Sequence, residues 1–157
     1  NMHLLDITAK NKQIELKMEM KKDILVLADI NSINTIIRNL ISNALKFTPA
    51  KGEVKLLAKV VEDFAEISVC DNGVGISQAV QDRIFQIDKR ISTKGTENET
   101  GTGLGLILCK EFAEKNGGTI RIESEEGRGS KFIFTVPLAQ PNKSLEKNHQ
   151  KIENLIP

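Results

Sequence analysis

Apolar residues recur along the chain with two different spacings, and the longest run has the spacing of a helix. Between residues 31 and 47 they fall on one helical face, at Ile33, Ile36, Ile37, Leu40, Ile41, Ala44 and Leu45. Thr48-Pro49 and Gly52 follow as stop signals, because proline and glycine disfavour a continuing helix. Three shorter helices are predicted over residues 1–12, 78–85 and 104–115.

Other segments alternate apolar and polar positions, or are short apolar runs between turn residues, and both patterns predict strands. These segments are residues 14–18, 24–28, 54–61, 64–70, 119–124 and 131–136. In the last of them Phe132, Phe134 and Val136 fall on one face. Strands grouped with helices, rather than strictly alternating with them, favour a layered α+β domain with a mixed sheet.

Composition narrows the classes of function. The 157 residues suffice for one domain, and 22 basic residues against 21 acidic ones leave a net charge of only +1. Without a basic excess and without Trp or Tyr, no nucleic-acid partner is expected. The longest apolar run, 24–28, is far shorter than the ~20 residues that span a bilayer, so we expect no direct membrane contact. Cys70 and Cys109 stand apart, which suggests neither a zinc site nor a disulfide and fits a reducing, cytoplasmic setting.

The chain begins at Asn1 in front of a helical pattern, which is typical of a piece cut from a longer protein. We expect residues 1–12 to end a preceding linker helix, 13–138 to form the domain, and 139–157 to be a polar tail or linker.

A polar stripe runs along the predicted 31–47 helix, beside its apolar face. It consists of Ser32, Thr35, Asn39, Asn43 and Lys46. Amide oxygens are neutral, hard ligands suited to a magnesium ion that keeps most of its waters, and Lys46 adds a positive charge for a phosphate. On the stripe alone, a solvated helix face that carries incidental asparagines is the favoured interpretation.

A second candidate lies where the predicted 64–70 strand ends. Alternation places Ile67, Val69 and Asp71 on the same side, so that Asp71 would lie at the edge of an apolar pocket and need a donor partner. The following Asn72-Gly73-Val74-Gly75 lets a planar ligand approach the backbone, and the amine of a purine would satisfy the carboxylate. An ordinary Asp-Asn-Gly turn explains the same residues.

A third candidate, Gly101-Thr102-Gly103-Leu104-Gly105-Leu106, runs directly into the predicted 104–115 helix, whose first backbone N–H groups can face an anion. Position 106 is Leu and no strand precedes, so this is not the dinucleotide-binding fingerprint; no P-loop motif occurs in the sequence either. Residues 88–103 are polar and aperiodic, as in a functional loop or a disordered one.

Taken in order, these segments resemble the ATP-binding catalytic domain of bacterial sensor histidine kinases, within the wider group that includes gyrase, MutL and the pyruvate dehydrogenase kinases. Residues 39–49 (Asn-Leu-Ile-Ser-Asn-Ala-Leu-Lys-Phe-Thr-Pro) are similar to the family's asparagine box. Residues 71–76 (Asp-Asn-Gly-Val-Gly-Ile) are similar to its first glycine box, 101–106 to its second, and Phe85 to its phenylalanine box. The resemblance covers about residues 1–138 and implies a two-layer α/β sandwich, in which helices cover one face of a mixed, mostly antiparallel sheet.

The resemblance also implies site residues, with ATP as the ligand and magnesium as the cofactor. Asn43 would bind the magnesium ion, Asn39 would support the metal and the phosphates, and Lys46 would contact phosphate. Asp71 would accept a hydrogen bond from the adenine amine, with 88–103 as a lid. The expected ATP-binding set is Asn39, Asn43, Lys46, Phe47, Asp71, Gly73, Gly75, Ile76, Phe85, Thr93, Lys94, Gly101, Thr102, Gly103, Leu104, Gly105 and Leu106.

Asn39, Asn43, Lys46 and Lys94 form the expected catalytic set, with Lys94 as the cation that reaches the terminal phosphate; a solvated loop lysine is the alternative for Lys94. Two departures concern the edges of this site. Residues 86–91 lack the aromatic residues common after the phenylalanine box, and Phe47 replaces a frequent Tyr.

Hydrolytic members of the group carry a glutamate general base at the position of Asn39, and an amide cannot take that proton. We therefore expect phosphoryl transfer to a histidine on a separate dimerisation domain of the same protein, with a response regulator receiver domain as the next partner and a homodimeric full-length protein. His3 and His149 lack the context of an acceptor histidine. A non-catalytic nucleotide-binding signalling module and, less favoured, an ATPase of the gyrase or MutL kind are the alternatives.

Overall fold

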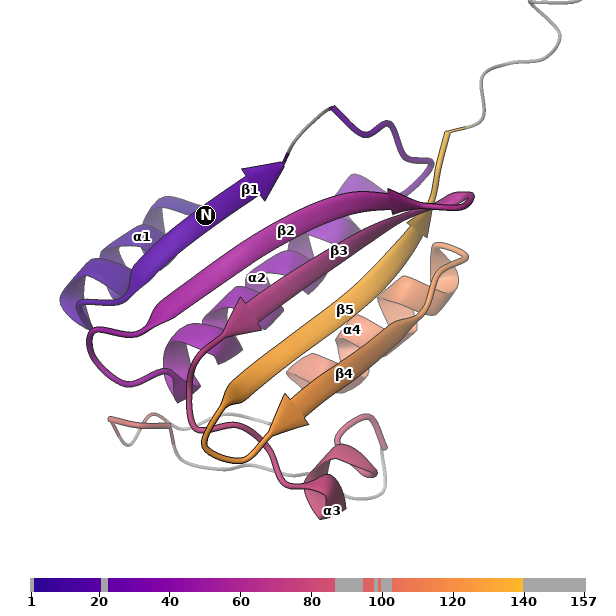
Figure 1. The fold of residues 1–157 in the computed structure, drawn as a ribbon. Helices are drawn as coiled ribbons and strands as arrows, with labels where there is room; N and C mark the ends of the chain where they lie inside the picture. Colours follow the sequence, from indigo (N-terminus) through magenta and orange to yellow (C-terminus); the bar gives the residue numbers. More distant parts are fainter. Residues whose placement is uncertain (1, 21–22, 87–94, 98, 100–102, 140–157) are drawn as a thin grey trace, which may run out of the picture.

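Five strands form one mixed sheet in the computed structural model of the chain, which describes residues 2–20, 23–86, 95–97, 99 and 103–139 (Figure 1). The strands are β1 (Glu15–Met20), β2 (Glu53–Val61), β3 (Phe64–Asp71), β4 (Ile120–Glu125) and β5 (Gly129–Pro137), in the order β1-β2-β3-β5-β4. β1 runs parallel to β2, and the other neighbouring pairs are antiparallel.

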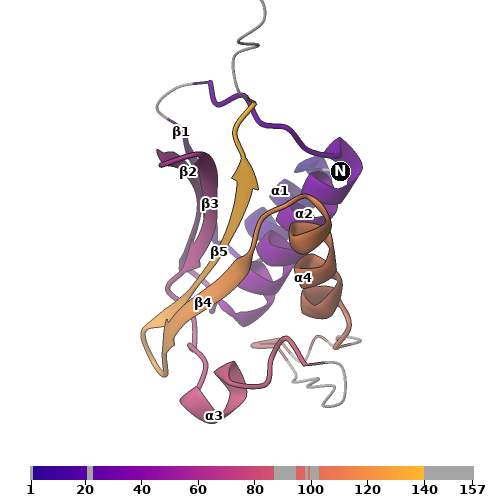
Figure 2. The same cartoon turned by 90° about the vertical axis from the view of Figure 1, so that its right-hand side faces the viewer.

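Helices cover one face of this sheet, which gives the two-layer arrangement expected for the fold (Figure 2). The covering helices are α1 (Met2–Asn11), α2 (Ile30–Phe47) and α4 (Gly105–Lys115), and the short α3 (Gln78–Gln81) lies beyond the strand ends. The predicted fold class, an α+β sandwich with a mixed and mostly antiparallel sheet, is confirmed.

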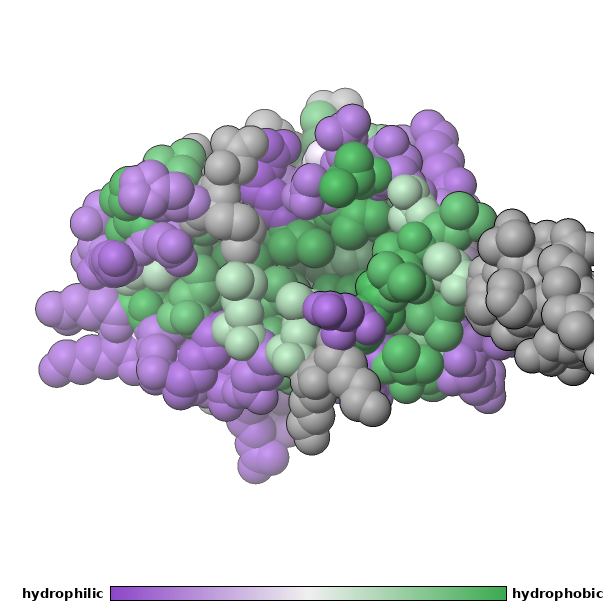
Figure 3. Space-filling view, turned by 90° about the horizontal axis from the view of Figure 1, so that it is seen from above, coloured by the Kyte–Doolittle hydropathy of each residue, from purple (hydrophilic) through white to green (hydrophobic). Residues whose placement is uncertain are grey.

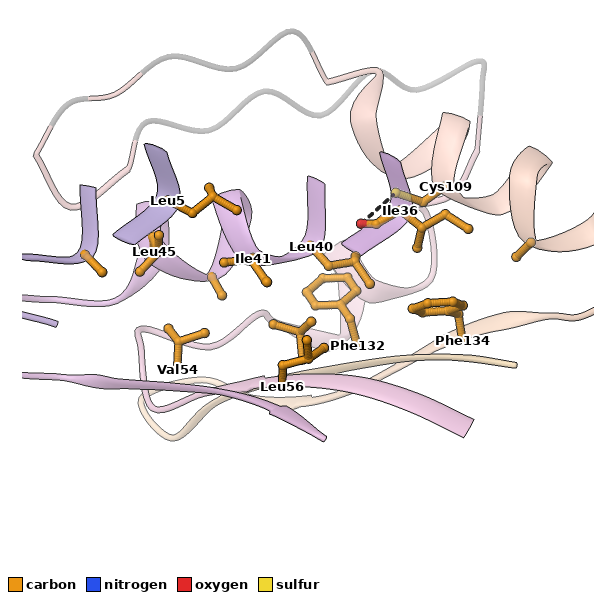
Figure 4. Close-up of a cluster of buried hydrophobic side chains, with 14 of the residues drawn as sticks. Leu5, Ile36, Leu40, Ile41, Leu45, Val54, Leu56, Cys109, Phe132 and Phe134 are labelled. Atoms are coloured by element: carbon orange, nitrogen blue, oxygen red, sulfur yellow. Dashed lines mark hydrogen bonds between the residues drawn. The ribbon is translucent and has the colours of Figure 1, made fainter. Parts of the chain in front are cut away.

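The core lies between α2 and the sheet. α2 begins where the Asp29 carboxylate accepts a hydrogen bond from the Ser32 N–H at 2.7 Å, and Thr48 ends it before proline. Its apolar face is buried, and Phe132 and Phe134 point toward it from β5 (Figure 4). Burial of one such side chain is worth about 1.5–3 kcal/mol, so this contact fixes α2 on the sheet.

Two predicted elements differ in the structure. The strand predicted over 24–28 does not form, and the segment makes one bridge, between Val26 and Leu138. β5 is paired with β3 along one edge as far as Pro137. Along its other edge it is paired with β4 and Thr119 as far as Thr135. Only the chain at the very end of β5 is therefore left for the 24–28 segment to pair with. The predicted 78–85 helix is also shorter, because a regular helix ends at Gln81 and turns follow.

The end of the sandwich that carries the 24–28 segment exposes apolar side chains, which form a broad patch when the molecule is viewed from above (Figure 3). Leu25, Leu27 and Ile30 are each more than 70% exposed, and Val60 and Val61 at the end of β2 are also exposed. Among the helices in the described part of the chain, none combines the length and apolar character needed to cross a membrane.

Candidate functional site

The polar stripe of α2 faces other protein segments. Asn39, Asn43 and Lys46 are half-buried and follow one another at intervals that keep them on one side of the helix. A methyl group placed on Gly105 would lie 3.5 Å from Asn39 Oδ1, and one placed on Gly95 would lie 2.5 Å from Lys46 Cγ. Gly105, at the start of α4, and Gly95 therefore lie against the two ends of the Asn39–Lys46 part of the stripe, which disfavours a fully solvated helix face.

Asn39 also contacts α4 further along that helix. Burial raises the pKa of the Cys109 thiol to about 12, and a hydrogen bond with the Asn39 side chain opposes that rise. Cys109 is fully buried, and its Sγ lies 4.0 Å from the Ile36 carbonyl oxygen. The Asn39 amide is thus held between α2 and the first turns of α4, close to the N-terminus of that helix.

Asp71 ends β3 on the side of the sheet that faces the helices. It lies opposite Val54, a fully buried core residue, as Val69 lies opposite Leu56. Because directly paired residues point to the same face, the predicted alignment of Asp71 with Ile67 and Val69 is confirmed.

The Asp71 carboxylate is held by backbone donors. Oδ1 accepts the Gly73 N–H at 2.9 Å and the Ser130 N–H at 3.2 Å. Burial raises the pKa of this carboxyl above its usual range, and the two backbone hydrogen bonds oppose the rise. In the described part of the chain, both hydrogen bonds to this side chain are accepted by Oδ1. They hold the carboxylate in one orientation and so fix the direction in which Oδ2 points.

The turn after β3 joins Asp71 to the end of α2. The Val74 N–H donates to the Phe47 carbonyl oxygen at 3.1 Å. Gly73 is buried so closely against this carbonyl that a methyl group on it would lie 2.3 Å from the oxygen, so only glycine fits. Lys46 extends over the neighbouring ring, with its Nζ 4.8 Å from the Phe47 ring centroid. The two candidates predicted separately, on α2 and after β3, are therefore adjacent (Figure 1).

A hydrogen-bonded group that the sequence did not reveal supports the first glycine box. The Ile76 N–H donates to Ser124 Oγ at 2.9 Å, and Gln81 Nε2 donates to the carbonyl oxygens of Ile76 and Ser124. Ser124 Oγ also lies 2.9 Å from Ser130 Oγ. Single serines in two strands and a glutamine in a short helix carry no pattern of their own, so nothing in the sequence distinguishes them from surface residues.

The other predicted site residues divide into two groups. Ile76, Phe85 and Leu106 are partly buried against the core, Gly103 has a φ of 69°, and Gly105 begins α4 after the N-cap residue Leu104. Thr93, Lys94, Gly101 and Thr102 lie outside the described residues, as does most of the predicted 88–103 lid.

The donors on α2 fit the chemistry of a magnesium ion. Asn39 and Asn43 supply amide oxygens one helical turn apart, on the side of α2 that meets the N-terminus of α4. Such neutral oxygens suit a small, hard cation that retains water and phosphate oxygens as its remaining ligands.

Comparison with known proteins identifies the family and the fold. Residues 28–140 match the family described as histidine kinase-, DNA gyrase B-, and HSP90-like ATPase. The chain belongs to this family. It is 38% identical over 131 residues to the adaptive-response sensory kinase SasA of Prochlorococcus marinus subsp. pastoris, an alignment that covers 82% of this chain and 35% of the relative.

Solved structures show the same fold. The catalytic domain of histidine kinase ThkA, in a nucleotide-free form, superposes with a TM-score of 0.73 at 30% identity, over 87% of this chain and 86% of that one. Full-length ShkA in complex with AMPPNP superposes with a TM-score of 0.74 at 30% identity, over 88% of this chain and 28% of that one. The chain spans about a third of the length of the curated relatives named SasA. Membership in this family supports ATP binding in sensor-kinase signalling.

Proposed function

We propose that this domain binds Mg-ATP and transfers the terminal phosphate to a histidine on a separate dimerisation domain of the same protein. The observation that carries the proposal is the adjacency of two features: the Asn39, Asn43 and Lys46 face of α2, and the buried Asp71 at the end of β3. One side offers ligands for a metal and phosphates, and the other offers an acceptor for a base.

Asp71 recognises adenine in this proposal. Its Oδ1 is occupied by the Gly73 and Ser130 N–H groups, so Oδ2 is the oxygen that accepts from the exocyclic amine. Gly73, Gly75 and Ile76 would allow the base to approach the backbone. Phe47 and Phe85 are the two aromatic residues of the predicted ATP-binding set.

The triphosphate would lie along α2 toward the start of α4. Asn43 would hold the magnesium ion with support from Asn39, and Lys46 would contact phosphate. The first N–H groups of α4 add the partial positive charge of a helix N-terminus. When bound, the magnesium ion would neutralise part of the negative charge on the phosphates. Thr93, Lys94 and Gly101 to Leu106 complete the proposed set, with Lys94 directed at the terminal phosphate.

Asn39 favours transfer over hydrolysis. It has no basic oxygen or nitrogen with which to activate water, and its contacts with Gly105 and Cys109 give it a positioning role. Catalysis of phosphoryl transfer rests on positioning and charge neutralisation, which amides and a lysine can supply without a general base.

We further propose that the full-length protein is a homodimeric two-component sensor kinase with this domain in the cytoplasm. A response regulator receiver domain would accept the phosphate from the histidine. Within the chain, residues 13–138 would form the catalytic domain, 1–12 the end of the linker helix and 139–157 a tail or linker. Neither nucleic acid nor direct membrane contact has a place in this function.

The test uses radiolabelled ATP with this chain alone, and again with a separately added dimerisation domain that carries the acceptor histidine. We expect ATP binding but negligible labelling and slow hydrolysis for the chain alone, because neither His3 nor His149 has the context of an acceptor. Addition of the second domain should give a label that is stable in base and lost in acid. Efficient labelling of the isolated chain would contradict a separate acceptor, and rapid phosphate release that survives Asn39→Ala would favour an ATPase.

A further inference from the structure

Lys12, directly after α1, is buried, and it is the most buried lysine in the described part of the chain. Its relative exposure is 5%, whereas lysine side chains are rarely buried unless they are paired. The Lys12 N–H donates to the Thr8 carbonyl oxygen, and Leu5 and Ala9 of α1 are buried in the core. The position of this side chain is therefore tied to that of α1.

Four oxygens surround the Lys12 ammonium. Nζ donates to the Leu45 carbonyl oxygen at 2.9 Å and lies 3.4 Å from that of Lys46. It also donates to Thr96 Oγ1 at 2.8 Å and to Glu99 Oε1 at 2.9 Å. Carbonyls in the last turn of a helix carry partial negative charge, so these acceptors offset the cost of burying the cation.

Residues 95–99, as far as they are described, lie on the end of α2 through the same group. The Thr96 N–H donates to the Lys46 carbonyl oxygen at 3.0 Å, and the Gly95 N–H donates to the Glu99 carbonyl oxygen at 2.9 Å. Glu99 Oε2 accepts the Glu97 N–H at 2.8 Å, so one carboxylate connects Lys12 to the backbone of this segment. Burial raises the pKa of Glu99, but hydrogen bonds from Lys12 and the backbone outweigh it and lower the net pKa, which keeps Glu99 ionised.

We propose that Lys12, Thr96 and Glu99 form a clamp that positions Lys46 and the segment beside it for nucleotide binding. Lys12 is then a positioning residue: it touches the backbone of Lys46 and the side chains of the 95–99 segment rather than the nucleotide. Because Lys12 directly follows α1, the clamp couples the placement of that helix to the phosphate side of the site. This inference rests on the proposed function, since it assigns a role in ATP binding.

Glu99→Gln is the most informative variant. Its side chain is one-third exposed, so the substitution keeps the shape and removes the charge without leaving a cavity. We expect the affinity for Mg-ATP, measured by calorimetry, to fall about fivefold, at the lower end of couplings between sites. We also expect faster amide hydrogen exchange at residues 95–97 and unchanged exchange in β4 and β5. Glu97→Gln, an exposed neighbour, is the matched control and should bind as the wild type does.

Lys12→Met removes the ammonium and keeps most of the stem, with the exposed Lys10→Met as its control. The double variant Lys12→Met/Glu99→Gln should bind ATP no more weakly than the weaker single variant, because either change already opens the clamp. Thermal unfolding of every variant separates loss of fold from loss of positioning.

The outcomes are distinct. If the wild-type chain binds no ATP, the proposed function fails and this inference fails with it. If the wild type binds and Glu99→Gln binds equally well, while exchange at 95–97 is faster, the clamp is only structural and this inference alone is overturned. If the affinity losses of the two single variants add fully in the double variant, Lys12 and Glu99 act separately and the clamp is also overturned.

Discussion

The strand side and the helix side of the proposed nucleotide site are built by different forces. On the strand side, Asp71 is held by backbone N–H groups of Gly73 and Ser130, and its strand is paired on both edges, by β2 and β5. On the helix side, the segment beside Lys46 is held to the end of α2 by one backbone hydrogen bond, from the Thr96 N–H, and by side-chain hydrogen bonds and one ion pair that centre on Lys12.

The two sides therefore differ in how easily the position of their residues can change. Backbone pairing over a buried core moves only when the whole sheet unfolds, whereas a few polar contacts open at much lower free energy. The proposed site would thus combine a fixed position for the base with an adjustable position for the phosphates. Four measurements can break or sharpen this comparison.

Asn43→Ala should give the largest effect. Loss of the proposed magnesium ligand removes several kcal/mol of transition-state stabilisation, so labelling of the separate dimerisation domain should fall by more than about a hundredfold. Asn43 is half-buried at the edge of the core, so the thermal midpoint should change little. Ser42→Ala, an exposed neighbour on the same helix, is the control, and comparable labelling by both variants would remove Asn43 from the site.

Phe134→Ala tests whether the core fixes the strand side. This ring is fully buried between β5 and the helices, and its removal should cost about 3–5 kcal/mol in the free energy of unfolding measured with urea. Leu25→Ala, at a position 76% exposed, should stay within about 0.5 kcal/mol of the wild type. If the two variants unfold at the same urea concentration, the sheet is not the rigid half of the site.

Asp71→Asn tests base recognition with little change of shape. The amide puts a donor or a weaker acceptor where the adenine amine needs an acceptor, and an unmatched buried polar group costs about 1–3 kcal/mol. Calorimetry should therefore show weaker ATP binding and reduced preference for ATP over GTP. Asp63→Asn, in the exposed β2–β3 turn, should change neither quantity. Equal ATP affinity for wild type and Asp71→Asn would show that Asp71 does not bind the base.

The smallest effect concerns the pH dependence of stability. Because burial raises the pKa of Asp71 in the folded state, the neutral form is favoured on folding. The resulting loss of stability is absent below the pKa of an unfolded aspartate, grows as the pH rises, and is complete above the raised pKa. Urea unfolding at a series of pH values should show this loss in the wild type and not in Asp71→Asn. Parallel pH profiles for the two proteins would mean that burial of this carboxylate costs nothing.

Much of this architecture was predictable from the sequence. α2 and the sheet each bury one face, and a buried face leaves a regular spacing of apolar residues along the chain. The periodic Ile and Leu positions of α2 defined both its apolar side and the polar stripe beside it. Alternation along β3 placed Asp71 on the core side, as the register with β2 confirms. The 24–28 strand was wrong because apolar composition does not show that the edges of β5 are already occupied.

The polar connections of the site could not be predicted. Lys12 lies in the run Lys10-Asn11-Lys12-Gln13, which is typical of a solvated helix end, and its partners are 33 to 87 residues away in sequence. Ser124 and Gln81 likewise meet the first glycine box through tertiary contacts alone. The predicted roles of Asn39, Asn43, Lys46 and Asp71 stay predictions, although the structure brings these residues together.

The order of the strands also bears on how the protein behaves at high concentration. β1 and β4 are the two outer strands, and an outer strand can recruit the chain of another molecule through its unpaired backbone groups. Both carry alternating charges: Lys17 pairs with Glu15 and Glu53, and Glu123 lies beside Arg121 and Lys131. A strand added at either edge would bring its side chains beside these charged side chains and partly desolvate them. The charged margins therefore oppose aggregation through the edges of the sheet.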